Sequence, residues 1–138
     1  MSGLLLDTHV WIWFAEGMEE MLTEQAAEEI DAAANHGALW ISVISVWELG
    51  LLEAKGWIRL ARSARDWIRQ ALDAPGIQLA GLDIEIALGC DALPDGLHAD
   101  PADRILVATA RYLGLRLAIR DRQILTYGEA GFVPTLAV

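Results

Sequence analysis

Four acidic side chains stand beside apolar segments of the sequence, at positions far apart along the chain. Asp7 follows the run Leu4–Leu6, and Asp121 comes just after another apolar stretch. Glu48 lies within the apolar segment VISVWEL, and Asp103 lies just before ILVATA. Carboxylates that meet in partly buried surroundings repel one another and lose hydration, so they need a compensating charge. A divalent cation supplies that charge, and oxygen ligands favour Mg²⁺ or Mn²⁺ over zinc.

Each of these acids also has a structural explanation as part of a helix cap. The segment Ser45–Glu48 has the spacing of a capping box, with its serine at the N-cap and its glutamate reaching back. The segment Asp100–Asp103 combines an N-cap aspartate, a proline at the first helical position and an acid two residues later. Asp7 and Asp121 each precede a predicted helix that they can cap. Taken singly, each acid favours the capping interpretation.

Apolar runs that suit buried strands alternate with amphipathic segments that suit helices. The expected strands are residues 3–6, 39–43, 77–82, 116–119 and 133–136. The expected helices are residues 9–15, 23–35, 43–55, 63–74, a short one after Asp83, 101–113 and 121–127. This alternation predicts βαβ units and a mostly parallel sheet with helices on both faces. We therefore predict an α/β protein, a three-layer α/β/α sandwich of about five strands, in a single domain of residues 1–138.

The predicted sheet brings the four acids together. In such sheets, ligands bind beyond the carboxyl ends of the strands. Asp7 and Asp121 follow predicted strands, and Glu48 and Asp103 lie in the first turns of predicted helices. Their convergence at one sheet edge weakens the capping interpretation and predicts a divalent metal site.

Composition and charge narrow the class of protein. The 138 residues are 54% hydrophobic and 22% charged, which is typical of a globular domain. The longest apolar runs are far shorter than the roughly 20 residues of a membrane span, and the start of the chain lacks the pattern of a signal peptide. The single cysteine, Cys90, cannot form an intramolecular disulfide. We expect a cytoplasmic protein without a membrane segment.

The net charge of −10 is unevenly distributed along the chain. All nine arginines lie after residue 58, where they nearly balance the acids, whereas the first 58 residues hold ten acids and one lysine. Arg62, Arg65 and Arg69 have helical spacing. They form either a solvated helix face, a strip that contacts phosphates, or a seat for an acidic partner segment.

The tryptophans are expected to fill the core or an interface rather than to stack on nucleobases. The segment Val10–Phe14, which holds Trp11 and Trp13, is apolar all round. One buried stripe of a small domain cannot cover such a helix, so an exposed remainder favours a dimer or a partner helix.

Four segments in order along the chain resemble the VapC-type PIN-domain toxins of prokaryotic toxin–antitoxin pairs. They are LLLDTHVWIW, ISVISVWELGLLEAKGWI, LHADPADRILVATA and LAIRDRQILTYG. The resemblance covers nearly the whole chain. It implies a PIN-like fold, endoribonuclease activity that depends on Mg²⁺ or Mn²⁺, a homodimer and a cognate antitoxin.

The resemblance also implies roles for individual residues. The catalytic and metal-binding quartet is carried by Asp7, Glu48, Asp103 and Asp121, with Asp100 as an auxiliary metal ligand. Thr8, His98 and Arg104 match family positions that bind substrate. Family members often have Thr or Ser two residues before the fourth acid, where this chain has Ile119. That departure removes a hydroxyl beside Asp121.

The residues therefore predict a metal-dependent endoribonuclease that hydrolyses RNA phosphodiester bonds. The alternative is a catalytically inactive PIN-like module whose acidic groove binds a basic partner peptide, and Ile119 favours it. A receiver-type signalling domain needs paired acids after its first strand and a lysine near the last. A haloacid-dehalogenase-like phosphatase needs an aspartate where His9 stands. Neither pattern is present.

Overall fold

Five parallel strands form the central sheet of the computed structural model, which describes residues 3–97 and 99–138. The strands are β1 (Leu4–Leu6), β2 (Leu39–Ser42), β3 (Ile77–Ala80), β4 (Arg116–Ile119) and β5 (Thr135–Ala137), in the spatial order β3-β2-β1-β4-β5. Every residue of β1 is buried, because this strand is central and covered on both faces. The predicted parallel α/β/α architecture is confirmed.

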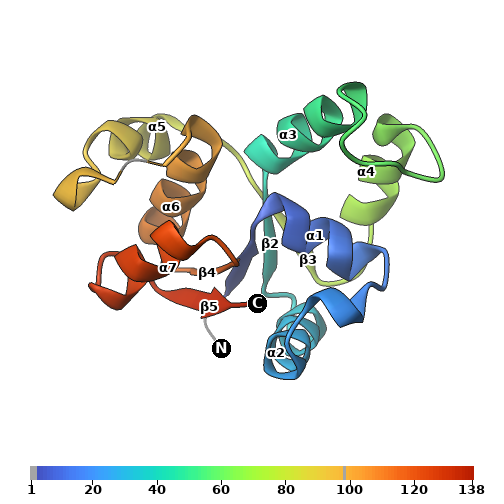
Figure 1. Cartoon of the computed structure of the whole chain (residues 1–138), viewed down its shortest axis with the longest axis horizontal. Helices are drawn as coiled ribbons and strands as arrows, with labels where there is room; N and C mark the ends of the chain where they lie inside the picture. Colours follow the sequence, from blue (N-terminus) through green and yellow to red (C-terminus); the bar gives the residue numbers. More distant parts are fainter. Residues whose placement is uncertain (1–2, 98) are drawn as a thin grey trace.

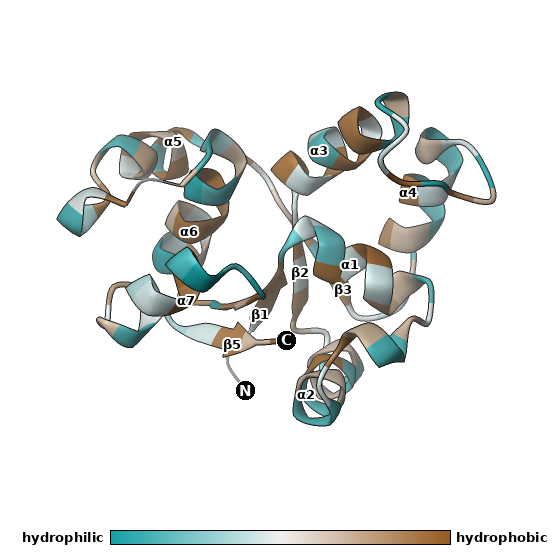
Figure 2. Ribbon diagram, in the orientation of Figure 1, coloured by the Kyte–Doolittle hydropathy of each residue, from teal (hydrophilic) through white to brown (hydrophobic). Residues whose placement is uncertain are grey.

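Helices cover both faces of the sheet (Figure 1). The helices are α1 (Thr8–Ala15), α2 (Glu24–Asn35), α3 (Val43–Ala54), α4 (Ala64–Leu72), α5 (Ile84–Asp91), α6 (Pro101–Leu113) and α7 (Arg122–Glu129), with short 3₁₀ turns at Glu19–Met21 and Pro94–Gly96. Alternate strand residues divide between two apolar clusters. Leu4 and Leu6 pack with α1, α2 and α4, whereas Leu5 packs with α5, α6 and α7. In Figure 2, hydrophobic residues, coloured brown, accordingly appear in the strands and in helices on both faces of the sheet.

The strand order reverses at β1. The chain passes from β1 outward to β2 and β3, then returns to the other side of β1 to form β4 and β5. In open parallel sheets the crevice at such a reversal, beyond the carboxyl ends of the strands, is the usual ligand site. Here that crevice lies where β1 and β4 end.

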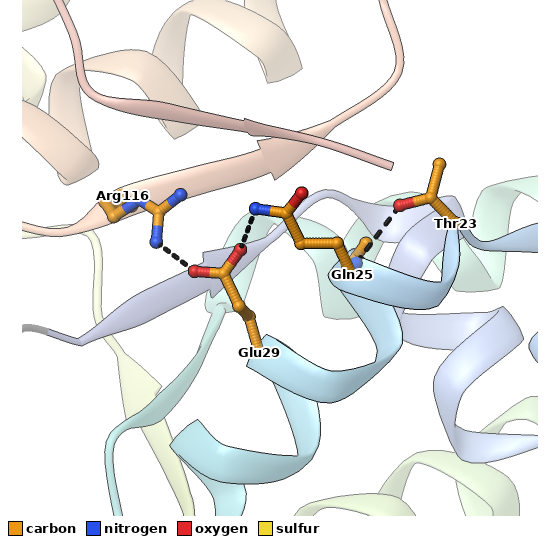
Figure 3. A network of polar contacts seen from close by, with 5 residues as sticks. Thr23, Gln25, Glu29 and Arg116 are labelled. Carbon is orange, nitrogen blue, oxygen red and sulfur yellow. Dashed lines mark hydrogen bonds and ion pairs between the residues drawn. The ribbon is translucent and has the colours of Figure 1, made fainter.

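The opposite end of β4 is fixed by a polar network on α2 (Figure 3). Arg116 Nη1 donates to Glu29 Oε1 at 2.6 Å, and Gln25 Nε2 donates to Glu29 Oε2 at 3.3 Å. Thr23 caps α2 by accepting from the Ala26 amide at 3.1 Å. The hydrogen bond from Arg116 lowers the pKa of Glu29. Because this ion pair is partly exposed, it contributes only about 0–1 kcal/mol to stability.

Some details of the sequence prediction are wrong, among them the cap of α3, the ends of β2 and β3 and the start of β5. Ser42 rather than Ser45 caps α3, because the helix begins three residues earlier than a capping box at Ser45 requires; the Ile44 amide donates to Ser42 Oγ at 3.1 Å. Strand β5 starts at Thr135 rather than at Val133, which is buried beneath α6 and α7 residues instead. Among the described residues, no helix is both long enough and apolar enough to cross a membrane.

Candidate active site

A cavity of about 390 Å³ opens where β1 and β4 end. The acids that line it are Asp7, Glu48, Asp100, Asp103 and Asp121, and the other lining residues are His9, Trp13, Ile119 and Arg120. The fold explains why they meet. The Asp7 amide donates to the Ala118 carbonyl at 3.0 Å, which holds the end of β1 against β4. Helix α3 contacts both α1 and α6, so Glu48 lies between the elements that carry Asp7 and Asp103.

Asp7 stands at the N-cap position of α1, yet its side chain makes no capping hydrogen bond. Burial raises the pKa of Asp7 to about 6; the charge of His9 opposes this rise and that of Glu48 adds to it. The amides of Thr8 and His9 at the start of the helix also oppose it. The structure therefore does not support the capping interpretation at Asp7, because the side chain makes no capping hydrogen bond.

The other four acids all raise the pKa of Asp103. Burial raises the pKa of Asp103 to about 7, with further contributions from the negative charges of four carboxylates. These are, in decreasing order, Asp100, Asp7, Glu48 and Asp121. Residues separated by up to 114 positions in sequence thus share one electrostatic site, as the sequence predicts.

Two buried hydroxyls hold Glu48. Thr8 Oγ1 lies 2.5 Å from Glu48 Oε1 and 2.8 Å from Ser45 Oγ, and both Thr8 and Ser45 are fully buried. Thr8 has one hydroxyl proton and a carboxylate can only accept, so Thr8 donates to Glu48 and Ser45 donates to Thr8. This relay fixes the orientation of the Glu48 carboxylate. Thr8 is therefore placed behind Glu48 rather than on the surface of the cavity.

Asp100 and Asp121 both cap helices while lining the cavity. Asp100 Oδ1 accepts from the Asp103 amide at 2.9 Å, and Asp121 Oδ1 accepts from the Ile124 amide at 3.0 Å. Both side chains are exposed, and each keeps a second oxygen that makes no capping contact. Capping and ligand binding are thus compatible at these two positions. Ile119, two residues before Asp121, is buried in the cluster beneath α6 and contributes no polar group.

The donor set suits a hard divalent cation that keeps part of its water shell. Within residues 3–97 and 99–138, no three acidic, histidine or cysteine side chains gather closely enough to hold an ion by themselves. Mg²⁺ usually retains several waters and takes only one or two carboxylates directly, so it does not require a closed cage. The crowding of carboxylates around Asp103 favours a cation, because no basic side chain in the described residues forms a salt bridge with these acids.

Two of the three residues expected to bind substrate are described by the structure, and His98 lies outside the described residues. Arg104 donates to the backbone carbonyls of Cys90 and Leu97, so its guanidinium ties α6 to the segment after α5. It does not line the cavity. Of the arginines with helical spacing, Arg62 precedes α4 and donates to Gln70, whereas Arg65 and Arg69 lie exposed within that helix.

We expect a Thr8→Val variant to bind Mn²⁺ more weakly by about tenfold or more, because groups that orient metal ligands typically contribute that much. It should also lose about 1–3 kcal/mol of stability, since Ser45 loses a buried hydrogen-bond partner. Titration calorimetry with Mn²⁺ and urea unfolding measure the two effects. Thr8→Ser keeps the hydroxyl and is the matched control. Equal Mn²⁺ affinity in the Val and Ser variants would contradict the positioning role.

The family follows from a comparison with known proteins. Residues 4–130 match the model of the PIN domain. The chain belongs to the PIN-domain family. It is 33% identical over 126 residues to Ribonuclease VapC22 of Mycobacterium tuberculosis (strain ATCC 25618 / H37Rv), a match that covers 90% of this chain and 91% of the relative. The resemblance predicted from the four sequence motifs is confirmed.

Solved structures of proteins from toxin–antitoxin complexes share the fold of this chain. The crystal structure of DNA-bound VapBC from Salmonella typhimurium superimposes with a TM-score of 0.69 at 16% identity, covering 99% of this chain and 98% of that one. FitAcB from Neisseria gonorrhoeae gives 0.65 at 21% identity, covering 96% of both chains. At these identities the likeness shows the fold alone.

Proposed function

We propose that this chain, as a single PIN-like domain, is a metal-dependent endoribonuclease and the toxin of a toxin–antitoxin pair. The observation that carries the proposal is the convergence of Asp7, Glu48, Asp100 and Asp121 on the partly buried Asp103. A cation at this cluster would offset the repulsion between the carboxylates. The family membership and the relative named as a ribonuclease support RNA hydrolysis as its use.

In this proposal Asp7, Glu48 and Asp103 hold one Mg²⁺ or Mn²⁺ ion, in part through water molecules that the ion keeps, and Asp121 and Asp100 serve a second ion or orient the attacking water. A bound divalent cation would lower the pKa of water and offset negative charge on the phosphate. The chain supplies the geometry. Thr8 and Ser45 orient Glu48, and the N-termini of α6 and α7 stand behind Asp103 and Asp121.

Cleavage of a mixed total-RNA pool by the purified protein tests this function. We expect cleavage with Mn²⁺ and none with EDTA. Folded protein, free of antitoxin, that cleaves nothing with either divalent ion would instead support the inactive module that binds a basic peptide. Ile119 favours that second function, because it leaves no hydroxyl beside Asp121. An inactive module should also show no thermal shift with Mn²⁺.

We further propose a cognate antitoxin as a partner, met in the cytoplasm. A second cavity of about 390 Å³ lies between α1 and α4, lined mainly by apolar residues that include Trp11, Phe14 and Trp67. Arg62 stands at its edge, and Arg65 and Arg69 lie exposed on the same helix. An amphipathic antitoxin segment with acidic residues fits this combination of apolar floor and basic edge.

Exposed apolar side chains on α3 and α5 support the proposed homodimer. Trp47 on α3 is 60% exposed, and Ile84 and Leu88 on α5 are 72% and 58% exposed. We expect Leu88→Glu to weaken self-association by roughly tenfold or more, because an interface cannot bury an unpaired charge cheaply. Light scattering across a concentration series measures it. Tyr112→Glu, at a site on α6 that is 54% exposed, is the control, and equal behaviour of both variants would count against this interface.

A further inference from the structure

The acidic cavity has a rim of different chemistry. His9, Trp13 and Arg120 line it beside the five acids. The Arg120 guanidinium carbon lies 4.5 Å from the centre of the Trp13 ring, and the His9 and Trp13 ring centres are 6.1 Å apart. Two aromatic rings and a guanidinium therefore form one continuous surface, which we name the aromatic rim. None of the three belongs to the acid cluster.

Arg120 is held in place by backbone oxygens. Its Nε donates to the backbone oxygen of Val138 at 3.4 Å, and Nη2 donates to the Met21 carbonyl. Among the described residues, no aspartate or glutamate side chain forms a salt bridge with it, although Asp121 is its neighbour in sequence. A guanidinium has five N–H donors, so three remain for an anion. The charge stays available at the mouth of a cavity that otherwise repels phosphate.

Trp13 is only partly buried. It packs against the apolar cluster that includes α1, it lines the cavity, and its ring lies under the Arg120 guanidinium. Trp11, two residues earlier, shows the contrast, because it is 1% exposed and packs edge-on against Trp67 within the core. The two tryptophans of α1 thus have different environments, and only Trp13 borders the acids.

We propose that the aromatic rim is a nucleotide subsite for single-stranded RNA. Arg120 contacts a phosphate next to the one that is cleaved, and the base of that nucleotide packs against Trp13 and His9. Single-stranded RNA is commonly bound by this pairing of aromatic or guanidinium planes with cationic contacts. The proposal rests on the proposed ribonuclease function and extends it, since it names what holds the strand beside the acids.

The competing explanation is structural. Arg120 joins the end of β4 to the residues before α2 and after β5, and Trp13 fills space beside the core. Variants must therefore preserve packing. Trp13→Leu keeps an apolar side chain and removes the ring, and Arg120→Gln keeps a polar stem and removes the charge. Arg116→Gln is the matched control, because it removes the same charge from the other end of β4 (Figure 3).

Kinetics separate substrate binding from structure. We expect both rim variants to raise KM for a single-stranded RNA by about tenfold, which is the order that one stacked base or one phosphate contact contributes. We expect kcat and the Mn²⁺-induced thermal shift to stay as in the unsubstituted protein. Arg116→Gln should leave KM unchanged. Variants that lose kcat and melting temperature together, with KM unchanged, would support the structural role and overturn the proposal.

Binding measurements assign the two contacts. With Asp7→Asn present to prevent cleavage, fluorescence anisotropy compares a labelled oligo(A) strand with a strand of reduced abasic ribose of equal length. Trp13→Leu should reduce the affinity for the strand with bases more than the affinity for the abasic strand. Arg120→Gln should reduce the affinity for both strands alike. In Arg120→Gln, the slope of log affinity against log salt concentration should decrease by about the contribution of one phosphate contact. Equal effects of Trp13→Leu on both strands would remove the base contact.

These experiments distinguish failure of the rim proposal from failure of the proposed ribonuclease function. If the unsubstituted protein cleaves RNA and the rim variants bind and cleave as it does, the aromatic rim is not a subsite although the ribonuclease assignment stands. If the unsubstituted protein cleaves no RNA, the ribonuclease assignment fails, and the rim proposal fails with it.

Discussion

An Asp7→Asn variant is expected to lose metal-dependent RNA cleavage while becoming more stable than the unsubstituted protein in EDTA. Burial and the nearby Glu48 charge hold the pKa of Asp7 at about 6, against 3.8 in water. Keeping this side chain ionised at neutral pH therefore costs the folded state about 3 kcal/mol, at 1.36 kcal/mol per pKa unit. Asparagine has the same shape without the charge, so it relieves most of that cost.

Loss of cleavage follows from the same carboxylate. Asn keeps one neutral oxygen in place of an anionic ligand, and we expect activity to fall by more than about a hundredfold, since even outer groups around a metal contribute up to that factor. Urea unfolding in EDTA and cleavage of RNA with Mn²⁺ measure the two effects together. A variant that is both inactive and less stable would return Asp7 to the role of a helix cap.

Asp83→Asn is the matched control for this result. Asp83 is also an N-cap aspartate, and it accepts from the Ile86 amide at 2.9 Å at the start of α5. It does not line the acidic cavity. Because Asn and Asp are similar N-cap residues, we expect little change in stability and none in cleavage. Opposite responses at two N-cap positions would distinguish a functional acid from a structural one.

The fold was predictable because local signals agree with the tertiary structure. Thr23, Ser63, Asp83, Asp100 and Asp121 each cap a helix by accepting from an amide in its first turn. Gly114 ends α6 with a φ of 68°, a left-handed conformation that favours glycine. These positions mark where elements begin and end. The parallel sheet then follows from strands that are apolar on both faces.

The start of α3 shows where local signals become ambiguous. Serines at positions 42 and 45 both precede the helical pattern, and the capping-box spacing to Glu48 favours Ser45. The structure places Ser45 inside the helix, fully buried, where its hydroxyl meets Thr8 from α1. Ser45 therefore makes a hydrogen bond to a residue 37 positions away, and the sequence pattern of α3 alone does not predict such a contact.

The roles of the arginines were the hardest to predict. Arg104 matches a family position beside an acid, yet its guanidinium donates to the backbone carbonyls of Cys90 and Leu97 and does not line the acidic cavity. Arg120 carried no sequence signal, because its ring partner Trp13 is 107 positions away. An arginine side chain is long enough to reach in several directions, so its spacing along a helix or strand does not determine what it contacts. The positions of acids that directly follow strands are easier to predict, because the end of the strand fixes where their backbone lies.

The second large effect is an inverted pH dependence of stability. Without divalent ions, we expect the free energy of unfolding to rise as the pH falls from about 8 toward about 5, whereas acid usually destabilises proteins. The pKa values of Asp7 and Asp103 are raised by burial and by neighbouring carboxylates to about 6 and about 7, against 3.8 when unfolded. Between about 4 and about 7 the folded state therefore binds more protons, so stability is lost as the pH rises through that window.

A divalent ion should weaken this dependence, because it binds the ionised acids and competes with protons. At a hundred times its dissociation constant, Mn²⁺ would stabilise the protein by about 2.7 kcal/mol near pH 8 and much less near pH 5. Urea unfolding at several pH values, with EDTA or with Mn²⁺, measures both curves. Asp103→Asn should flatten the EDTA curve, whereas Asp66→Asn, an exposed site on α4, should not. A curve in EDTA that falls steadily with acid would mean that the five carboxylates do not share one partly buried site, and the case for a cation at that site would lose its physical basis.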